Sequence, residues 1–138
     1  MATLVRLSHV GFSVPRARFD EECEFWEKLI GLTYVHGQPG RVAFFTADPL
    51  RDHEFIIYAA DGPIPGHDDQ GCMVNHFALD VATDAEVDEL TQRLRGAGYK
   101  VDEPPRNRKQ NKIISPCGIM VEINTPPYMQ SAPGKVGD

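Results

Sequence analysis

The sequence has few cysteines, and they are not arranged as pairs. Cys23, Cys72 and Cys117 are an odd number, lie far apart and form no Cys-x-x-Cys motif. This argues against a disulfide framework and against a structural zinc knot, and it fits a reducing cytoplasm better than an oxidising compartment.

Positive charge and long apolar runs are also lacking. The 14 lysine and arginine residues are outnumbered by 20 acidic residues, for a formal net charge of −6. Because phosphate binding needs a basic surface, we do not expect a nucleic-acid partner. No apolar run approaches the roughly 20 residues that span a bilayer, and the opening MATLVRLSHVGF does not resemble a signal peptide. We therefore expect a cytoplasmic protein with no membrane segment.

What the sequence does contain is a pair of similar strands, each with one histidine. Residues 74–81 (VNHFALDV) and 7–14 (LSHVGFSV) both alternate like half-buried strands. His76 and His9 lie opposite the apolar rows and are separated by 67 residues (76 − 9), close to half the chain. This spacing predicts an internal duplication with one metal-binding histidine in each half.

The remaining patterns repeat in the same order. We expect a helix over residues 19–30, with Phe19, Cys23, Trp26 and Ile30 inward and Glu22 outward, and a second helix over 86–95, capped by Thr83 with Glu86. Strands are expected at residues 7–14, 32–35, 41–47 and 53–60, and at 74–81, 99–102, 109–115 and 119–124, with a turn at 36–40. The prediction is one α+β domain with two βαβββ modules, about 4–60 and 72–124, a linker at 61–71 and an irregular tail at 125–138.

Glu122 supplies the third candidate ligand. It lies in the last expected strand, on the face opposite Ile119, Val121 and Ile123. A carboxylate in the middle of a strand is costly to bury unless it is paired or bound to a cation. Together with His9 and His76 it forms a two-histidine, one-carboxylate set, which suits Fe(II) or Mn(II) and also Zn, Ni or Co.

Three segments resemble the vicinal oxygen chelate superfamily, which includes glyoxalase, bleomycin-resistance proteins, methylmalonyl-CoA epimerase and type I extradiol dioxygenases. They are SHVGFSV (8–14), NHFALDV (75–81) and SPCGIMVEI (115–123), and the last is similar to the P-x-G-x-x-x-E signature. The resemblance implies paired βαβββ modules that form a half-open barrel around a metal, with Glu122 as a ligand. It also implies a homodimer.

The number of protein ligands bears on the reaction. Glyoxalase-type sites resemble a four-ligand arrangement, with a second carboxylate from the last strand of the first module. Shifting Glu122 back by 67 residues reaches Phe55, and no carboxylate shares that parity; Glu54 has the opposite parity and would turn inward only through a bulge. A three-ligand site favours oxygen activation.

The segment RDHEFII (51–57) resembles the extradiol dioxygenases, in which a histidine near the start of this strand is an acid–base group. His53 could take a proton from a catechol and return it near neutral pH; the alternative is that it simply opens a strand. The tyrosine expected about ten residues before the glutamate is replaced by Lys112, which could orient an anionic oxygen or be solvated. The residues expected to line the substrate pocket are Phe45, Phe55, Tyr58 and Asn75.

Three function classes follow. The first is an Fe(II) extradiol-type dioxygenase that cleaves a small aromatic diol with O2. The second is a divalent-metal lyase, isomerase or epimerase that acts through an enediolate. The third is a metal-free protein that sequesters a ligand, as bleomycin-resistance proteins do.

Overall fold

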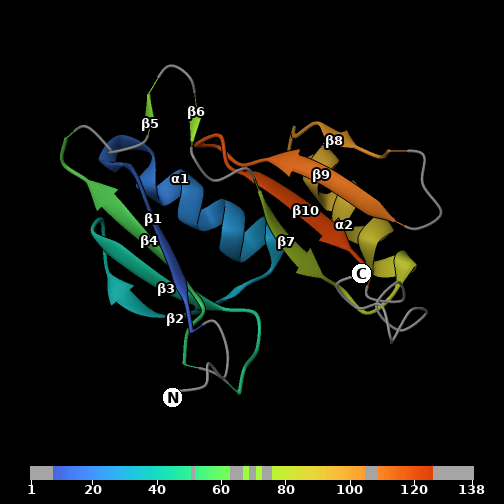
Figure 1. Cartoon of the computed structure of the whole chain (residues 1–138), viewed down its shortest axis with the longest axis horizontal. Helices are drawn as coiled ribbons and strands as arrows, with labels where there is room; N and C mark the ends of the chain where they lie inside the picture. The colour runs from blue at the N-terminus through green and yellow to red at the C-terminus, as the bar shows by residue number, and fades with distance from the viewer. Residues whose placement is uncertain are drawn as a thin grey trace, which may run out of the picture. The chain divides into compact units, whose positions relative to one another are not determined.

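The computed structural model describes residues 8–50, 52–62, 67–68, 71–72, 76–104 and 109–125. The chain divides into two compact units, Met1–His67 and Asp68–Asp138 (Figure 1). Each unit contains the order strand, helix, strand, strand, strand, so the predicted α+β fold with two βαβββ modules is confirmed. The half-open barrel stays a prediction. In the described ranges, no helix has the length and apolar character that crossing a bilayer requires.

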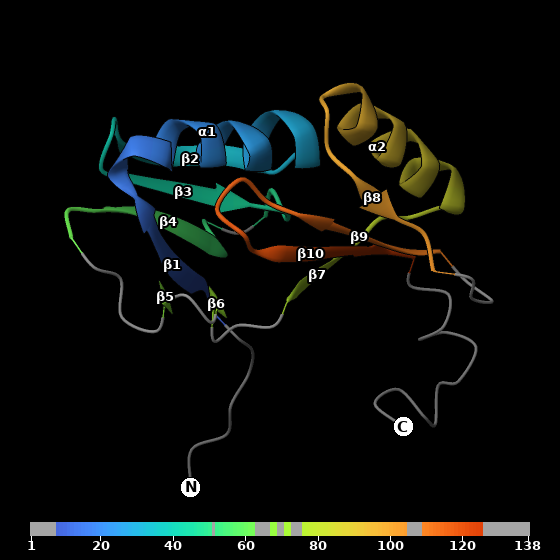
Figure 2. The ribbon, with the colours of Figure 1, turned by 90° about the horizontal axis from the view of Figure 1, so that it is seen from above.

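The first unit forms a four-stranded sheet in the order β1-β4-β3-β2. β1 and β4 are parallel, and the other neighbours are antiparallel. The helical segment lies along one face of this sheet (Figure 2). The bounds are β1 (Val10–Pro15), a 3₁₀ turn (Arg16–Arg18), α1 (Phe19–Glu24), a π-helical turn (Phe25–Ile30), β2 (Thr33–Gln38), β3 (Val42–Thr46) and β4 (Phe55–Ala60).

The helix contributes a buried acidic residue that the apolar pattern did not predict. Phe19, Trp26 and Ile30 are buried as expected, but Glu22 is also fully buried, and Cys23 is only half-buried. The Trp26 indole N–H donates a 3.0 Å hydrogen bond to Oε1 of Glu22. This bond helps to offset the cost of removing the carboxylate from water, so the expectation that Glu22 points outward was wrong.

The second unit repeats the topology, with strand order β7-β10-β9-β8 and β7 parallel to β10. Its elements are β7 (Phe77–Asp80), α2 (Asp84–Gly96), β8 (Val101–Asp102), β9 (Gln110–Ile114) and β10 (Met120–Asn124). Thr83 accepts a hydrogen bond from the backbone N–H of Glu86, and the Glu86 carboxylate accepts one from the Thr83 N–H. The predicted capping box is therefore confirmed. Between the modules, β5 (His67–Asp68) pairs with β6 (Gly71–Cys72).

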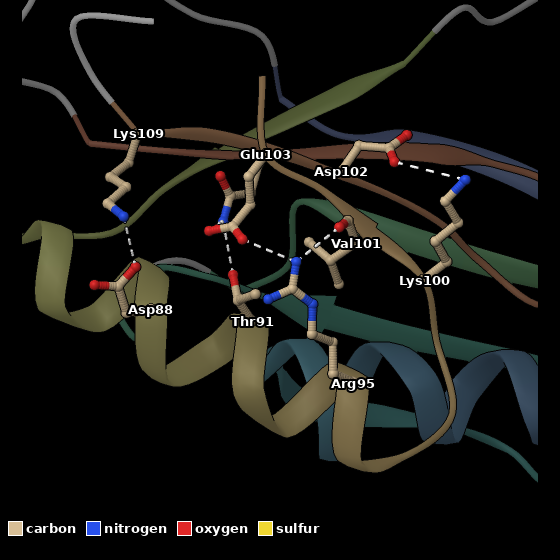
Figure 3. A network of polar contacts seen from close by, with 9 residues as sticks. Asp88, Thr91, Arg95, Lys100, Val101, Asp102, Glu103 and Lys109 are labelled. Carbon is tan, nitrogen blue, oxygen red and sulfur yellow. Dashed lines mark hydrogen bonds and ion pairs between the residues drawn. The ribbon is translucent and has the colours of Figure 1, made fainter. Parts of the chain in front are cut away.

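A polar network joins α2 to the edge of its sheet (Figure 3). Arg95 donates to the backbone oxygen of Val101 at 3.0 Å and to the Glu103 carboxylate at 2.8 Å. Lys109 pairs with Asp88 at 2.8 Å. These contacts fix the register of the helix over β8 and β9, while Val87, Leu90 and Leu94 supply the buried apolar stripe.

Candidate metal centre

Glu122 lies at the centre of a polar face in the second unit. In β10 it pairs with Ala78 of β7 on one side and with Lys112 of β9 on the other. Cross-strand partners share a face of a sheet, and alternation places His76 on the same face as Ala78. Oε2 of Glu122 lies 3.9 Å from Nε2 of His76 and 4.0 Å from Nζ of Lys112. The structure therefore brings together three residues predicted from the sequence: His76, Lys112 and Glu122.

The other oxygen of Glu122 is held by two amides. Oε1 accepts hydrogen bonds from Nε2 of Gln110 at 2.6 Å and from Nδ2 of Asn124 at 2.9 Å. Burial by itself would raise the pKa of Glu122. The hydrogen bonds from Asn124 and Gln110, together with the charges of His76 and Lys112, outweigh that effect and lower its pKa below the ordinary value.

The two amides also show how committed this arrangement is to an anionic carboxylate. Oε1 of Gln110 and Oδ1 of Asn124 are buried and have no hydrogen-bond partner within the part of the chain that the structure describes. Both amides thus turn their N–H groups toward Glu122 and leave their own oxygens unsatisfied, which is costly. An ionised carboxylate held through one oxygen, with its second oxygen beside an imidazole, fits a divalent metal of the kind expected from the donor set.

The first unit contains a cluster of histidines. The His9 ring lies before β1, with its centroid 5.2 Å from that of His53. Nδ1 of His53 lies 2.6 Å from Oδ2 of Asp52. His53 is thus beside the ligand predicted from the sequence, and a carboxylate orients its ring.

His36 joins this cluster because of a β-bulge. Tyr34 pairs with Phe45, but His36 pairs with Phe44, so Val35 is an extra residue in β2. His36, Asp52 and His53 each offer a possible ligand atom, and these atoms all lie within 4.8 Å of one another. The expected turn at residues 36–40 was therefore wrong, since β2 continues to Gln38 and carries His36 within the strand.

Two of the expected pocket residues lie on the other face of the first sheet. Phe45 and Phe55 pair with each other and are buried, and the Phe55 ring packs against Trp26 with centroids 4.6 Å apart. They belong to the core under the helix, so their assignment to the pocket does not agree with the structure. Tyr58 lies on the opposite face, which it shares with Ile56 and Phe44, and Asn75 lies outside the described residues.

The expected fourth-ligand position is also corrected by one residue. Val10 pairs with Phe55 and Phe77 with Val121, so the first strands are offset by 67 residues (77 − 10) and the last strands by 66 (121 − 55). The counterpart of Glu122 is therefore Ile56, which cannot bind a metal. Oε1 of Glu54 accepts hydrogen bonds from the Thr46 hydroxyl and from the backbone N–H groups of Ala47 and Asp48, so this carboxylate holds a loop.

Four residues of these two clusters were missed by sequence reasoning. Gln110 and Asn124 could have been found, because they have the same parity in their strands as Lys112 and Glu122. Asp52 precedes a named histidine but had no motif. His36 carried no signal, because only the bulge turns it to this face.

Comparison with known proteins agrees with the fold. The model of the family described as the glyoxalase/bleomycin resistance protein/dioxygenase superfamily matches residues 6–123. The chain belongs to this superfamily. The resemblance inferred from the sequence is thus confirmed at the level of the superfamily, while the closer similarity to extradiol dioxygenases stays a prediction.

Individual members of the superfamily are distant from this chain. The chain is 28% identical over 127 residues to uncharacterized protein PA2024 of Pseudomonas aeruginosa, across 86% of each chain. A fosfomycin resistance protein, FosX, from Listeria monocytogenes, in complex with Mn(II) and 1S,2S-dihydroxypropylphosphonic acid, aligns with a TM-score of 0.72 at 19% identity. That alignment covers 94% of this chain and 97% of FosX. A lactoylglutathione lyase from Agrobacterium tumefaciens aligns at 0.58 and 22% identity, covering 84% and 91%. At these identities the two structures support the fold alone.

Proposed function

We propose that the protein is a divalent-metal enzyme with His9, His76 and Glu122 as its metal ligands. The observation that carries this proposal is the Glu122 carboxylate, whose side chain is 8% exposed and whose Oε2 lies 3.9 Å from Nε2 of His76. Membership of the superfamily supports the addition of His9, which holds the matching place in the first module. The bound metal would supply Lewis acidity or oxygen activation at a substrate that presents two neighbouring oxygens.

Fe(II)-dependent cleavage of a small aromatic diol is the reaction that we propose first. Its support is the three-ligand set, since Ile56 occupies the place of a fourth protein ligand. In this reaction both atoms of O2 enter the ring-opened product, so no external reductant is consumed. Lys112, next to Glu122, would bind an anionic oxygen of the substrate.

His53 is the acid–base residue in this proposal. Its ring lies beside His9, and Asp52 accepts a hydrogen bond from Nδ1 when that nitrogen carries the proton. This arrangement leaves Nε2 to take a proton from a substrate hydroxyl and to return it later in the reaction. Asp52 would hold the tautomer and the orientation of the ring.

The alternative is a lyase, isomerase or epimerase that uses Mn, Zn, Ni or Co as a Lewis acid through an enediolate. The fold similarity to lactoylglutathione lyase and to the Mn(II)-containing FosX favours keeping it. Because Glu54 is committed to the loop at residues 46–48, water would take the fourth position. For either enzyme we propose a cytoplasmic homodimer, which the family resemblance and the cysteine pattern support.

The test is metal content followed by oxygen uptake. Protein purified without chelator or affinity-tag metal would be analysed for elements, then reconstituted anaerobically with Fe(II) and offered a panel of catechols and hydroquinones. Oxygen uptake restored only by Fe(II) supports the dioxygenase. Tightly held zinc, nickel or manganese without oxygen uptake supports the alternative, and failure to bind any metal supports the ligand-sequestering class and refutes both enzymes.

A matched pair of variants tests the ligand assignment itself. Glu122→Gln should lower metal affinity while circular dichroism shows an unchanged fold, because the amide keeps the shape and loses the charge. Glu24→Gln, at an exposed position of α1, removes the same charge away from the site and should bind metal normally. Equal affinity in the two variants would remove Glu122 from the ligand set.

A further inference from the structure

We propose that His36, Asp52 and His53 form a second site for a divalent transition-metal ion, contained wholly in the first unit. One possible ligand atom from each residue lies within 4.8 Å of the other two. Two imidazoles and one carboxylate suit the later first-row divalent ions, such as Zn(II), Co(II) and Ni(II). None of these three residues is among the ligands His9, His76 and Glu122, so the site is additional to the one proposed above.

The backbone brings these ligands together by a local departure from regular strand geometry. Alternation alone would place His36 on the same side of β2 as Tyr34, which pairs with the buried Phe45. The extra residue Val35 reverses that parity, so His36 pairs with Phe44 and lies on the face opposite the helix. Bulges are often found where a side chain is re-aimed toward a site.

One aromatic ring holds the two imidazoles in place. The His36 ring stacks on Phe44, with centroids 4.3 Å apart and planes 24° apart. The same Phe44 ring meets His53 edge-on at 5.0 Å and 79°. Phe44 is a residue of β3 in the middle of the sheet, so it fixes the separation of two rings that come from different segments.

The remaining adjustment is small. Ligand atoms around a tetrahedral zinc, with bonds of 2.0–2.1 Å, lie about 3.3 Å apart. Asp52 and His53 are already closer than that, at 2.6 Å, through the hydrogen bond that a metal would replace. The Asp52 side chain is 71% exposed, so its carboxylate can turn toward an ion without disturbing the core.

Occupation of this site would remove His53 from any other task. An imidazole bound to a metal, with its carboxylate partner recruited to the same ion, cannot exchange a proton with a substrate. Excess metal should therefore inhibit the reaction; this consequence, unlike the site itself, rests on the proposed function.

Metal stoichiometry of the full-length apoprotein tests the proposal. Equilibrium dialysis with Zn(II) and visible absorption with Co(II) should give two ions per chain for the wild type. His36→Phe keeps the ring stacked on Phe44 but removes the nitrogen donors, and Asp52→Asn removes the charge; each should bind one ion. Glu122→Gln should also bind one ion, and the combination of His36→Phe with Glu122→Gln should bind none.

The controls separate this site from the proposed catalytic one. Asp20→Asn removes an exposed charge on α1 and should bind two ions. If His36→Phe and Asp52→Asn both bind as many ions as the wild type, with unchanged thermal melts, the second site is refuted. If Glu122→Gln leaves the stoichiometry unchanged while His36→Phe lowers it, the catalytic ligand set fails and the second site stands. Ring resonances of His36 and His53 that shift together on addition of Zn(II) would confirm the ligands by an independent measurement.

Discussion

Gln110 donates a hydrogen bond of 2.6 Å from Nε2 to Oε1 of Glu122, across the pairing of β9 with β10. Asn124 donates to the same oxygen at 2.9 Å. One oxygen of the carboxylate is thereby fixed by two donors, and the other lies toward His76 and Lys112. The orientation of a metal ligand is therefore set by neighbours that sequence reasoning did not name.

Replacing Gln110 by Met should loosen this orientation. We expect metal affinity to fall roughly 10- to 100-fold, as is usual when a group that orients a ligand is lost. Isothermal titration of the apoprotein with metal measures the change. Gln92→Met, at an exposed position of α2, is the matched control and should leave the affinity unaltered. Wild-type affinity in Gln110→Met would show that the hydrogen bond does not position the ligand.

His53→Asn should lower kcat by about 10²–10⁴-fold if His53 transfers protons. Asp52→Asn should lower kcat less, because the imidazole remains and only its orientation and tautomer are disturbed. Steady-state kinetics with saturating metal and substrate gives both values, and the KM of each variant shows whether binding has changed. A loss confined to KM in His53→Asn would assign this residue to substrate binding alone.

Cys23 should react slowly with alkylating reagents. Burial, and then the nearby charges of Asp20, Glu22 and Glu27, raise its pKa to about 12. Because the thiolate is the nucleophile, its reactive fraction at pH 8 is roughly a thousandfold below that of a thiol with a pKa of 9. Mass spectrometry after timed treatment with iodoacetamide would measure this, with the urea-unfolded protein as the control. Rapid labelling of Cys23 in the folded protein would contradict the expected protection.

Glu103 should contribute to the stability of the second unit in a pH-dependent way. The hydrogen bond from Arg95 is the main cause of its lowered pKa. Its folded-state pKa is below the ordinary 4.5, so its contribution is fully present above pH 4.5 and is lost as the pH falls through the folded value. Glu103→Gln should slightly lower the Tm at pH 7 and have no effect near pH 2. The contribution is small, because the pair is exposed, and an equal difference at both pH values would exclude the ion pair as its cause.

The parts of the fold that rest on local patterns could be predicted from the sequence. Thr83 and Glu86 lie three residues apart, and a capping box needs no tertiary information. The place of Glu122 among alternating apolar residues was enough to assign it to a polar face, because parity within one strand is a local property.

The parts that depend on the lengths of connections could not be predicted. Phe45 and Phe55 pair across ten residues, whereas their counterparts Ile113 and Val121 pair across eight. A single offset taken from the first strands is therefore one residue wrong in the last strand, and it selected Phe55 where the structure has Ile56. The burial of Glu22 likewise depends on its partner Trp26, which hydrophobicity alone does not identify.

The extra residue at Val35 makes the second site sensitive to insertions and deletions as well as to substitutions. A relative could retain all three ligands in an alignment and still have its histidine on the core side of the sheet, if it lacked one residue between Gly31 and Phe44. The distribution of this site among related chains should therefore follow the length of that segment together with ligand identity. During divergence, a single-codon deletion would be enough to remove the site, and a single-codon insertion would be enough to create it.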